Sequence, residues 1–302
     1  MYQEAETSLT TVRDFLRWAA SRFEENTLYY GHGTDNAWDE AVALISQILL
    51  LPEGVDGLIL DAALTPTEKA RVIAALKRRI DKREPTPYIT GKAWFAGLPF
   101  IVDQRVLIPR SPIAELIQNG FYPWLTHEPR IILDMCCGSA CIGIALAQAY
   151  PDANVTCSDN SDDALAVAAQ NVAMHEVDGQ VSLLNSRTWD GFAASDVFDL
   201  IVVNPPYVDR GDFESMPAEF EQEPAVALVS GDDGLDFTKE FLQSAAKHMA
   251  DNGLLVFEVG NSGEALENQY PNMPLTWVEF EHGGVGVFVM TKQEVLAAQD
   301  LV

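Results

Sequence analysis

From Pro129 to the C-terminus, short apolar runs of strand length alternate with longer apolar runs at helical spacing. This alternation is typical of a parallel, doubly wound α/β sheet, because each parallel strand needs a long crossover before the next. Only His-Gly-Gly separates the last two strand-like runs, so these are predicted to pair antiparallel. The predicted strands are 130–135, 154–159, 181–186, 199–204, 253–260, 276–281 and 285–291, and the predicted helices lie near 140–150, 161–175, 234–249 and 262–269.

The first 85 residues predict a separate helical domain. Apolar residues recur at helical spacing in 11–26, 38–51 and 65–83, the second stretch ends at Pro52 and Gly54, and Thr65-Pro66 is a typical start of the third. Pro85 and Pro87 then interrupt the helical pattern. The stretch YITGKAWFAGLPFIVDQRVLIPR predicts a β-hairpin linker. We therefore expect a helical domain over 1–85, a linker over 86–108 and an α/β domain over 109–302.

The charge of the chain restricts its partners. A formal net charge of −26 argues against general binding to nucleic acids, which requires a basic face, and favours small-molecule chemistry or a basic protein partner. No apolar run has the length of a membrane span, and the acidic, polar N-terminus does not resemble a signal peptide. Four cysteines without an exported context are expected to be reduced thiols in the cytoplasm.

Charge is also unevenly distributed along the chain. Residues 69–83 hold seven basic residues and one acid, whereas residues 205–240 hold ten acids and two basic residues. The basic cluster is interpreted mainly as a solvated helix end whose cations complement the helix dipole, with an RNA contact as the alternative. The acidic segment is either ordinary surface or a rim that attracts a basic partner.

The stretch ILDMCCGSACIG, residues 132–143, is expected to form a cofactor loop between a strand and a helix. Asp159 ends the second strand, 21 residues after Gly138, where an acid accepts hydrogen bonds from ribose hydroxyls. Cysteine and alanine replace the expected glycines. Because a Cβ at positive φ costs about 1 kcal/mol and blocks close approach of the backbone, the loop suits a cofactor without phosphates. The cysteines do not have the paired spacing of zinc sites, so no metal is predicted.

The fourth strand ends in Asn204-Pro205-Pro206-Tyr207, at the sheet edge where open α/β folds bind ligands. An amide nitrogen is a poor nucleophile because its lone pair is delocalised into the carbonyl. We expect the Asn204 side-chain oxygen and the Pro205 carbonyl to accept its two N–H groups and aim the lone pair. The prolines stiffen the turn, and Tyr207 is expected to cover the flat group and exclude water.

This tetrapeptide, downstream of the loop and Asp159, resembles that of the S-adenosylmethionine-dependent methyltransferases that modify planar amino nitrogens. Further stretches across nearly the whole chain resemble the protein-glutamine N5-methyltransferases: YITGKAWF, VLIPRSPIAELI, EFEQEPAVAL, SGDDGLDF and EVGNS. Ser111-Pro112-Ile113, the DMC of the loop and EFEHGGVGVF are similar to the branch that modifies protein three of the large ribosomal subunit. The release-factor branch carries Pro-Asp/Glu-Thr-Glu at the first of these positions.

The resemblance implies a Rossmann-like class I S-adenosylmethionine methyltransferase fold, α/β, with a seven-stranded sheet whose last strand is antiparallel, and a small helical domain that recognises the substrate. It implies catalysis by Asn204, Pro205, Pro206 and Tyr207. It implies cofactor binding by Asp134, Cys136, Cys137, Gly138, Ser139, Ala140, Asp159, Ser186, Arg187, Thr188 and Asn204.

Three positions depart from the family pattern. Cys137 stands in place of threonine, and Ala140 in place of the last glycine of the loop. Arg187 stands in place of the aspartate expected to meet the adenine amino group, and arginine cannot accept that hydrogen bond. Either the affinity for the cofactor is lower, or another acceptor such as Ser186 or Thr188 substitutes.

The expected function is therefore methylation of a glutamine in a basic protein of the large ribosomal subunit, free or in an assembling ribosome, with no DNA or membrane partner. Three alternatives remain. The substrate is a release factor; the chain is a binding module with weakened catalysis, as Ala140 and Arg187 suggest; or, against the acidic charge, adenine in nucleic acid is the target.

Overall fold

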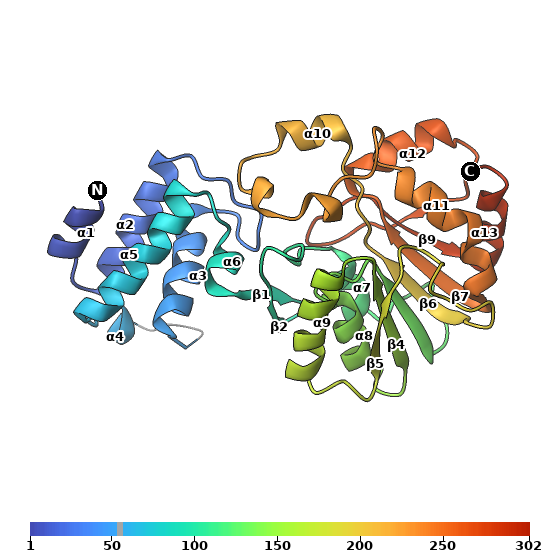
Figure 1. Cartoon of the computed structure of the whole chain (residues 1–302), viewed down its shortest axis with the longest axis horizontal. Coiled ribbons are helices and arrows are strands. Elements are labelled where there is room, and N and C mark those ends of the chain that lie inside the picture. The colour runs from blue at the N-terminus through green and yellow to red at the C-terminus, as the bar shows by residue number, and fades with distance from the viewer. Residues whose placement is uncertain (53–56) are drawn as a thin grey trace. The chain divides into compact units, whose positions relative to one another are not determined.

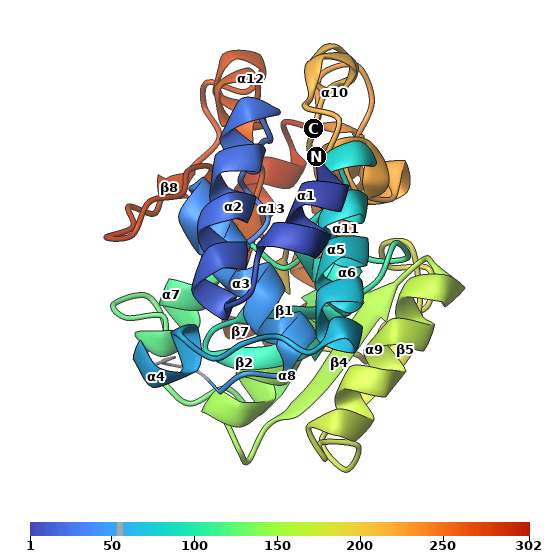
Figure 2. The same cartoon turned by 90° about the vertical axis from the view of Figure 1, so that its left-hand side faces the viewer.

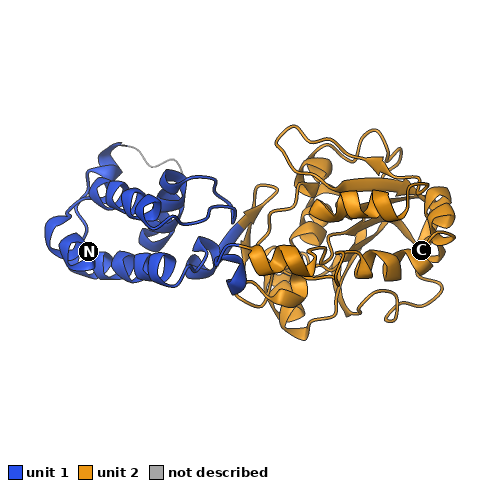
Figure 3. Ribbon diagram, turned by 90° about the horizontal axis from the view of Figure 1, so that it is seen from above, with its two compact units in different colours: residues 1–93, 217–222 blue, residues 94–216, 223–302 orange. Residues whose placement is uncertain are grey.

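The computed structural model describes residues 1–52 and 57–302, which form two compact units (Figure 3). Unit 1 comprises Met1–Ala93 and Pro217–Gln222, and unit 2 comprises Trp94–Met216 and Glu223–Val302. The short segment Pro217–Gln222 thus belongs with the N-terminal residues, although it lies far along the sequence. Gly54, expected at the end of a helix, lies outside the described residues.

Unit 1 is a small helical bundle around its own core. The helices α2, α3 and α5 pack against one another (Figures 1 and 2) and bury Phe15, Phe23, Leu44 and Leu76 between them. Side-chain caps fix where these helices begin, because a polar side chain satisfies a free backbone N–H group in the first turn. The helices are α1 (Tyr2–Ser8), α2 (Val12–Glu25), α3 (Ala37–Leu49), α4 (Gly57–Leu60), α5 (Pro66–Asp81) and α6 (Thr86–Thr90).

Three arginines of the basic cluster 69–83 form ion pairs within unit 1. Arg79 is buried and paired with Glu40 and Glu219 at 2.5 Å and 3.3 Å, and Arg83 reaches the same Glu219 at 3.3 Å. Arg78 pairs with Glu84 at 2.5 Å. The expectation of a solvated helix end is therefore wrong for Arg79, whose charge is neutralised by two buried carboxylates, whereas Lys77 and Lys82 are exposed.

Unit 2 contains a seven-stranded sheet in the order β5-β4-β3-β6-β7-β9-β8, with helices on both faces (Figure 1). β9 is antiparallel to both β7 and β8, and the other neighbouring pairs are parallel, which confirms the predicted fold class. The strands are β3 (Ile131–Met135), β4 (Asn154–Asp159), β5 (Val181–Asn185), β6 (Phe198–Val203), β7 (Met249–Glu258), β8 (Thr276–Trp277) and β9 (Val287–Thr291).

Successive residues of the central strands contribute to two separate cores, as the period of two requires for strands buried on both faces. Ile132, Leu200 and Val256 face one core, while Leu133 and Ile201 face the other. The helices of unit 2 are α7 (Ile113–Gln118), α8 (Cys141–Ala149), α9 (Asp162–Met174), α10 (Arg210–Ser215), α11 (Asp236–Ala245), α12 (Gly263–Gln269) and α13 (Lys292–Gln299), with short 3₁₀ helices η1 (Phe220–Gln222, in unit 1), η2 (Ala225–Ala227), η3 (Ala246–His248) and η4 (Gly260–Ser262).

One predicted local structure is wrong, and another is confirmed over part of its length. The connection between the last two strands covers residues 278–286 rather than His-Gly-Gly, because Gly283, Gly284 and Gly286 adopt positive φ and the flanking residues leave the strands. The predicted hairpin is present as β1 (Lys92–Phe95) and β2 (Leu98–Ile101), but the residues before it form the helical turn α6. None of the helices in 1–52 and 57–302 combines the length and hydropathy needed to cross a membrane.

Candidate functional site

The sheet register brings chemically distinct residues into one row. Met135, the last residue of β3, pairs with Ser158 of β4 and with Val203 of β6. The residues that follow these three, Cys136, Asp159 and Asn204, therefore end up side by side at the carboxyl edge of the sheet. This edge, where the strand order reverses between β3 and β6, is where open α/β sheets bind ligands.

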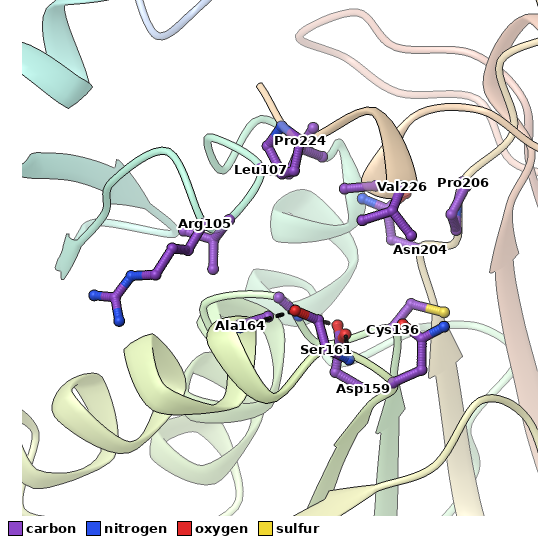
Figure 4. Close-up of a pocket in the computed structure, with 14 residues that line it drawn as sticks. Arg105, Leu107, Cys136, Asp159, Ser161, Ala164, Asn204, Pro206, Pro224 and Val226 are labelled. Carbon is purple, nitrogen blue, oxygen red and sulfur yellow. Dashed lines mark hydrogen bonds between the residues drawn. The ribbon is translucent and has the colours of Figure 1, made fainter. Parts of the chain in front are cut away.

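A pocket opens above this row (Figure 4). Cys136 and Asp159 lie on its sheet side, while Pro224 and Val226 lie on the opposite side and Asn204 and Pro206 close one end. Its lining belongs entirely to unit 2: Arg105, Val106, Leu107, Cys136, Gly138, Asp159, Asn160, Ser161, Ala164, Asn204, Pro206, Pro224, Val226 and Ala227.

The loop between β3 and α8 keeps a glycine-like backbone despite its side chains. Cys136, Gly138 and Ala140 have φ of 62°, 53° and 62°. Nothing lies within 4 Å of the position that a Cβ on Gly138 would occupy, so this part of the loop faces open space beside the pocket. The Ala140 methyl is fully buried in the core, and Ala140 is the N-cap residue of α8. The loop therefore tolerates the left-handed conformation at Ala140 because its methyl group is packed.

Asp159 holds the loop and still faces the pocket. Its two carboxylate oxygens accept the backbone N–H groups of Gly138 and Ser161, each at 2.9 Å. Burial raises the pKa of this carboxyl against the lowering effect of these N–H donors. Each carboxylate oxygen has a further lone pair, so Asp159 can accept two more hydrogen bonds from a ligand.

Asp134 lies fully buried beneath the loop. Its Oδ2 accepts the N–H of Gly143 at 2.8 Å, while its Oδ1 has no partner in hydrogen-bond geometry among the described residues. Burial raises its pKa to about 7, against the lowering effect of the Gly143 N–H. The buried, incompletely paired Asp134 and the partly buried Asp159 fit a ligand that brings positive charge to this end of the pocket.

The cysteines contribute packing at the site. Cys137, Cys141 and Cys157 are buried in the core on the α8 side of the sheet, and burial raises the pKa of the Cys141 thiol to about 12. Among the described residues, no His, Cys, Asp and Glu side chains are grouped so that they could hold a metal ion. These protonated thiols act as small apolar groups behind the loop.

The four residues after β6 have different surroundings. Asn204 and Pro206 line the pocket, whereas the hydroxyl of Tyr207 donates to Glu258 at 3.1 Å. The hydroxyl of Ser262 donates to the Tyr207 carbonyl at 2.6 Å. Tyr207 is thus held at both ends by residues outside the tetrapeptide.

Residues 186–188 do not line this pocket. Ser186 is buried, and its hydroxyl donates to Asp190 at 2.8 Å and accepts the N–H of Gly191 at 2.9 Å, so it stabilises its own turn. The half-exposed Arg187 side chain pairs with Glu240 at 2.8 Å. Thr188 donates to the same Glu240 at 3.2 Å. The structure therefore aims the Arg187 guanidinium at a carboxylate of α11.

Several pocket residues were missed by the sequence reasoning. Val106 and Leu107 begin the quoted VLIPRSPIAELI stretch, and Pro224, Val226 and Ala227 belong to the quoted EFEQEPAVAL stretch. A buried ion pair joins the two segments: Arg110 donates to both carboxylate oxygens of Glu223 at 2.6 Å and 2.8 Å. The sequence did hold a signal that these two stretches come together: one contains an arginine and the other a glutamate, each among apolar residues.

Only some of the acidic side chains in residues 205–240 lie at the surface. Glu219 and Glu223 are buried in ion pairs, whereas Asp212, Glu214 and Glu221 are exposed. The remaining acids are at least partly exposed. Enough acidic surface is left to favour a basic partner, but two of the ten acids serve the structure.

Comparison with known proteins agrees with this geometry. Residues 122–232 match the family model of the methyltransferase small domain. The chain is 44% identical over 300 residues to the ribosomal protein uL3 glutamine methyltransferase of Francisella tularensis subsp. tularensis, covering 99% of this chain and 95% of that protein. It is 42% identical over 301 residues to the protein of the same name from Neisseria meningitidis serogroup B, covering 99% of both.

Among solved structures, the hMettl16 catalytic domain in complex with MAT2A 3'UTR hairpin 1 aligns with a TM-score of 0.50 and 15% identity, over 78% of this chain and 83% of that one. At that identity the likeness concerns the fold alone. The two full-length relatives carry the assignment, because each shares more than two fifths of its aligned residues with this chain. The chain belongs to the ribosomal protein uL3 glutamine methyltransferases, a family of methyltransferase enzymes.

Proposed function

We propose that the chain transfers a methyl group from S-adenosylmethionine to the side-chain nitrogen of a glutamine in ribosomal protein uL3. The observation that carries this proposal is the row of Cys136, Asp159 and Asn204 at one sheet edge, in a chain that matches uL3 glutamine methyltransferases along its whole length. In this row, Cys136 and Asp159 would lie against the cofactor. Asn204, beside them, would accept a hydrogen bond from the substrate amide.

The residues present fit S-adenosylmethionine. The carboxylate of Asp159 would accept the ribose hydroxyls, and the loop from Cys136 to Ala140 would lie against the amino acid part. The incompletely paired carboxylate of Asp134 favours the positive charges of this ligand. When bound, this cofactor supplies an electrophilic methyl group on a sulfonium. Ser139, Ser186 and Thr188 do not line the pocket, and their assignment to the cofactor stays a proposal.

Asn204 and Pro205 would hold the substrate amide. The side-chain oxygen of Asn204 and the carbonyl of Pro205 accept its two N–H groups, which localises the nitrogen lone pair and aims it at the methyl group. Pro205 and Pro206 restrict the turn, so these acceptors need little reorganisation. Tyr207 excludes water from the amide. The methylated nitrogen then loses its extra proton readily, so no strong base is required.

Charge favours a basic protein as the substrate. The net charge of −26 and the exposed acids Asp212, Glu214 and Glu221 attract a basic ribosomal protein and repel DNA. We infer that uL3 is met in the cytoplasm, before or during ribosome assembly, and that neither DNA nor a membrane is a partner. The alternative substrate is a release factor, and the test has to compare it with uL3.

We further propose that residues 1–85 recognise the substrate, that 86–108 are a linker, and that 109–302 carry the chemistry. The helical part exposes large apolar side chains, including Trp38, Leu50 and Leu58. Exposed aromatic and apolar groups of this kind are typical anchors for a protein partner. Trp38→Ala is expected to raise the KM for uL3 and to leave the affinity for the cofactor unchanged.

The substrate assignment is tested by transfer of label. The protein is incubated with radiolabelled S-adenosylmethionine and, in separate reactions, with uL3 purified from cells that lack the modification, with a release factor and with duplex DNA. Label in uL3 alone supports the proposal. Label in the release factor alone would transfer the assignment to that substrate, and label in DNA would overturn it.

A further inference from the structure

A fourth residue belongs to the row at the sheet edge. Val203 of β6 pairs with Phe257 of β7, so Asn204 is followed along the edge by Glu258. Glu258 is only 4% exposed, and it lies at the end of a strand between two apolar neighbours. A carboxylate in such a place is costly unless hydroxyl or N–H groups donate to it.

Two hydroxyl groups donate to Glu258. Ser111 reaches one carboxylate oxygen at 2.5 Å, and Tyr207 reaches the other at 3.1 Å. Ser111 is itself buried and accepts the N–H of Ile113 at 3.1 Å, so its hydroxyl is fixed at the start of α7.

Tyr207 is also confined at its ring and its carbonyl. A Cβ on Gly260 would lie 2.4 Å from Cε2 of the tyrosine ring, so only a glycine allows the ring to lie against this backbone. A Cβ on Gly234 would lie 2.3 Å from the Tyr207 carbonyl oxygen, to which Ser262 donates at 2.6 Å. These contacts restrict the position of the Tyr207 ring.

We propose that Glu258 and Ser111 are positioning residues, which fix the rotation of the Tyr207 ring so that it covers the substrate amide held beside Asn204. Glu258 is buried, does not line the pocket and accepts the Tyr207 hydroxyl, so it acts through Tyr207. Ser111 acts one step further away, by orienting Glu258. This inference rests on the proposed function and assigns roles to residues that the sequence analysis did not place in the site.

Fixing the Tyr207 ring affects the orientation of the substrate amide rather than the binding of the cofactor. A ring free to rotate leaves the amide in a wider range of positions and admits water, which lowers the rate of the chemical step. The cofactor pocket is lined by neither Ser111 nor Glu258. Loss of either residue is therefore expected to lower kcat while the dissociation constant of S-adenosylmethionine is unchanged.

The test is a pair of double-mutant cycles. Ser111→Ala and Glu258→Gln are each measured alone and together with Tyr207→Phe, which keeps the ring and removes the hydroxyl. Each single variant is expected to lose about tenfold in kcat on uL3. In the Tyr207→Phe background, Ser111→Ala and Glu258→Gln are expected to cost less than about twofold, because no hydroxyl is left to orient. Calorimetry is expected to give the same cofactor affinity for every variant.

Thermal unfolding of each variant identifies loss of folding, and if Ser111→Ala is unfolded, Glu258→Gln carries the test. Ser182→Ala is the control, because this hydroxyl donates to Val155 in β4, away from the pocket. Losses that simply add in the double variants, or a fall in cofactor affinity that accounts for the lost rate, would overturn the inference. Failure of the proposed function is distinguishable, because the unmodified chain itself would then leave uL3 unlabelled.

Discussion

The backbone nitrogen of Gly143 lies 2.8 Å from Oδ2 of Asp134, so the first turn of α8 rests directly on the buried carboxylate of β3. A Cβ at residue 143 would lie 3.0 Å from that oxygen and 2.1 Å from Sγ of Cys157 in β4. The helix that follows the cofactor loop therefore approaches two central strands at a distance that only glycine permits. Because α8 and Asp134 are in direct contact, the position of the cofactor loop depends on the charge of the Asp134 carboxyl.

Gly143→Ala is expected to destabilise the fold by about 3 kcal/mol, because the new methyl group overlaps Cys157 and neither strand can move away. Denaturant unfolding measures the loss. Combining it with Cys157→Ala, which removes the overlapping sulfur, should recover part of the stability. Gly179→Ala is the matched control, since nothing lies within 4 Å of its Cβ position. A Gly143→Ala protein as stable as the control would contradict the close approach.

The pKa of Asp134 predicts a dependence of stability on pH. Its value in the folded chain, about 7, lies above the ordinary 3.8, so the folded chain keeps this proton longer than the unfolded chain does. The contribution to stability is complete below pH 4 and is lost as the pH rises from about 4 to about 7. Asp134→Asn keeps an acceptor for Gly143 and removes the titration.

The free energy of unfolding of the unmodified chain, minus that of Asp134→Asn, should therefore fall across this pH range and stay constant above pH 7. The affinity for S-adenosylmethionine should change in the opposite direction, because the ligand's positive charge favours the ionised carboxyl. The unmodified chain should bind more tightly as the pH rises toward 7, and Asp134→Asn should show a weaker dependence, which reflects Asp159. Identical pH profiles for the two proteins would rule out this role of Asp134.

Arg79→Met is expected to destabilise unit 1 by about 3–5 kcal/mol, because it leaves Glu40 and Glu219 buried without a counter-charge. Arg13→Met removes a comparable ion pair with Asp61, but both partners are more than half exposed, so its cost is expected to be about 0.5 kcal/mol. Denaturant unfolding compares the two variants. Similar losses would show that the network around Arg79 is not electrostatically important.

Arg187→Ala is expected to leave the dissociation constant of S-adenosylmethionine within about twofold of its original value. The side chain is half-exposed, pairs with Glu240 and does not line the pocket, and such a pair contributes about 0–1 kcal/mol to stability. Calorimetric titration is the measurement. A tenfold change in affinity would show that residue 187 reaches the cofactor, as the family pattern implies for the aspartate that it replaces.

The strands and the edge that carries the site were predictable because residues buried on both faces leave near-continuous apolar runs, and because Asp159 and Asn204 follow such runs directly. Glu258 follows one too, but its role depends on Ser111 and Tyr207, which lie 147 and 51 residues away from it. Such contacts leave no periodicity in the sequence. The same is true of Glu219, whose pairing with Arg79 joins Pro217–Gln222 to unit 1.

For Arg187, the sequence predicted a contact with the cofactor that the side chain does not make with the pocket. The family pattern placed it beside the cofactor by position, while the structure directs its side chain to Glu240 on α11. A position in an alignment fixes the backbone, but the direction of a long charged side chain depends on which partner the fold brings near. Residues 106–107 and 224–227 were quoted within family stretches without a role, because their place in the pocket depends on how the fold brings two distant segments together.

The central claim is that the acceptor is a glutamine of uL3, held by Asn204. The most direct measurement is peptide mass spectrometry of uL3 after reaction with the unmodified chain and with Asn204→Ala, at equal occupancy by S-adenosylmethionine. The account predicts one added methyl group on a glutamine side chain with the unmodified chain, and none with Asn204→Ala. A methyl group on a lysine, or an undiminished yield with Asn204→Ala, would contradict it.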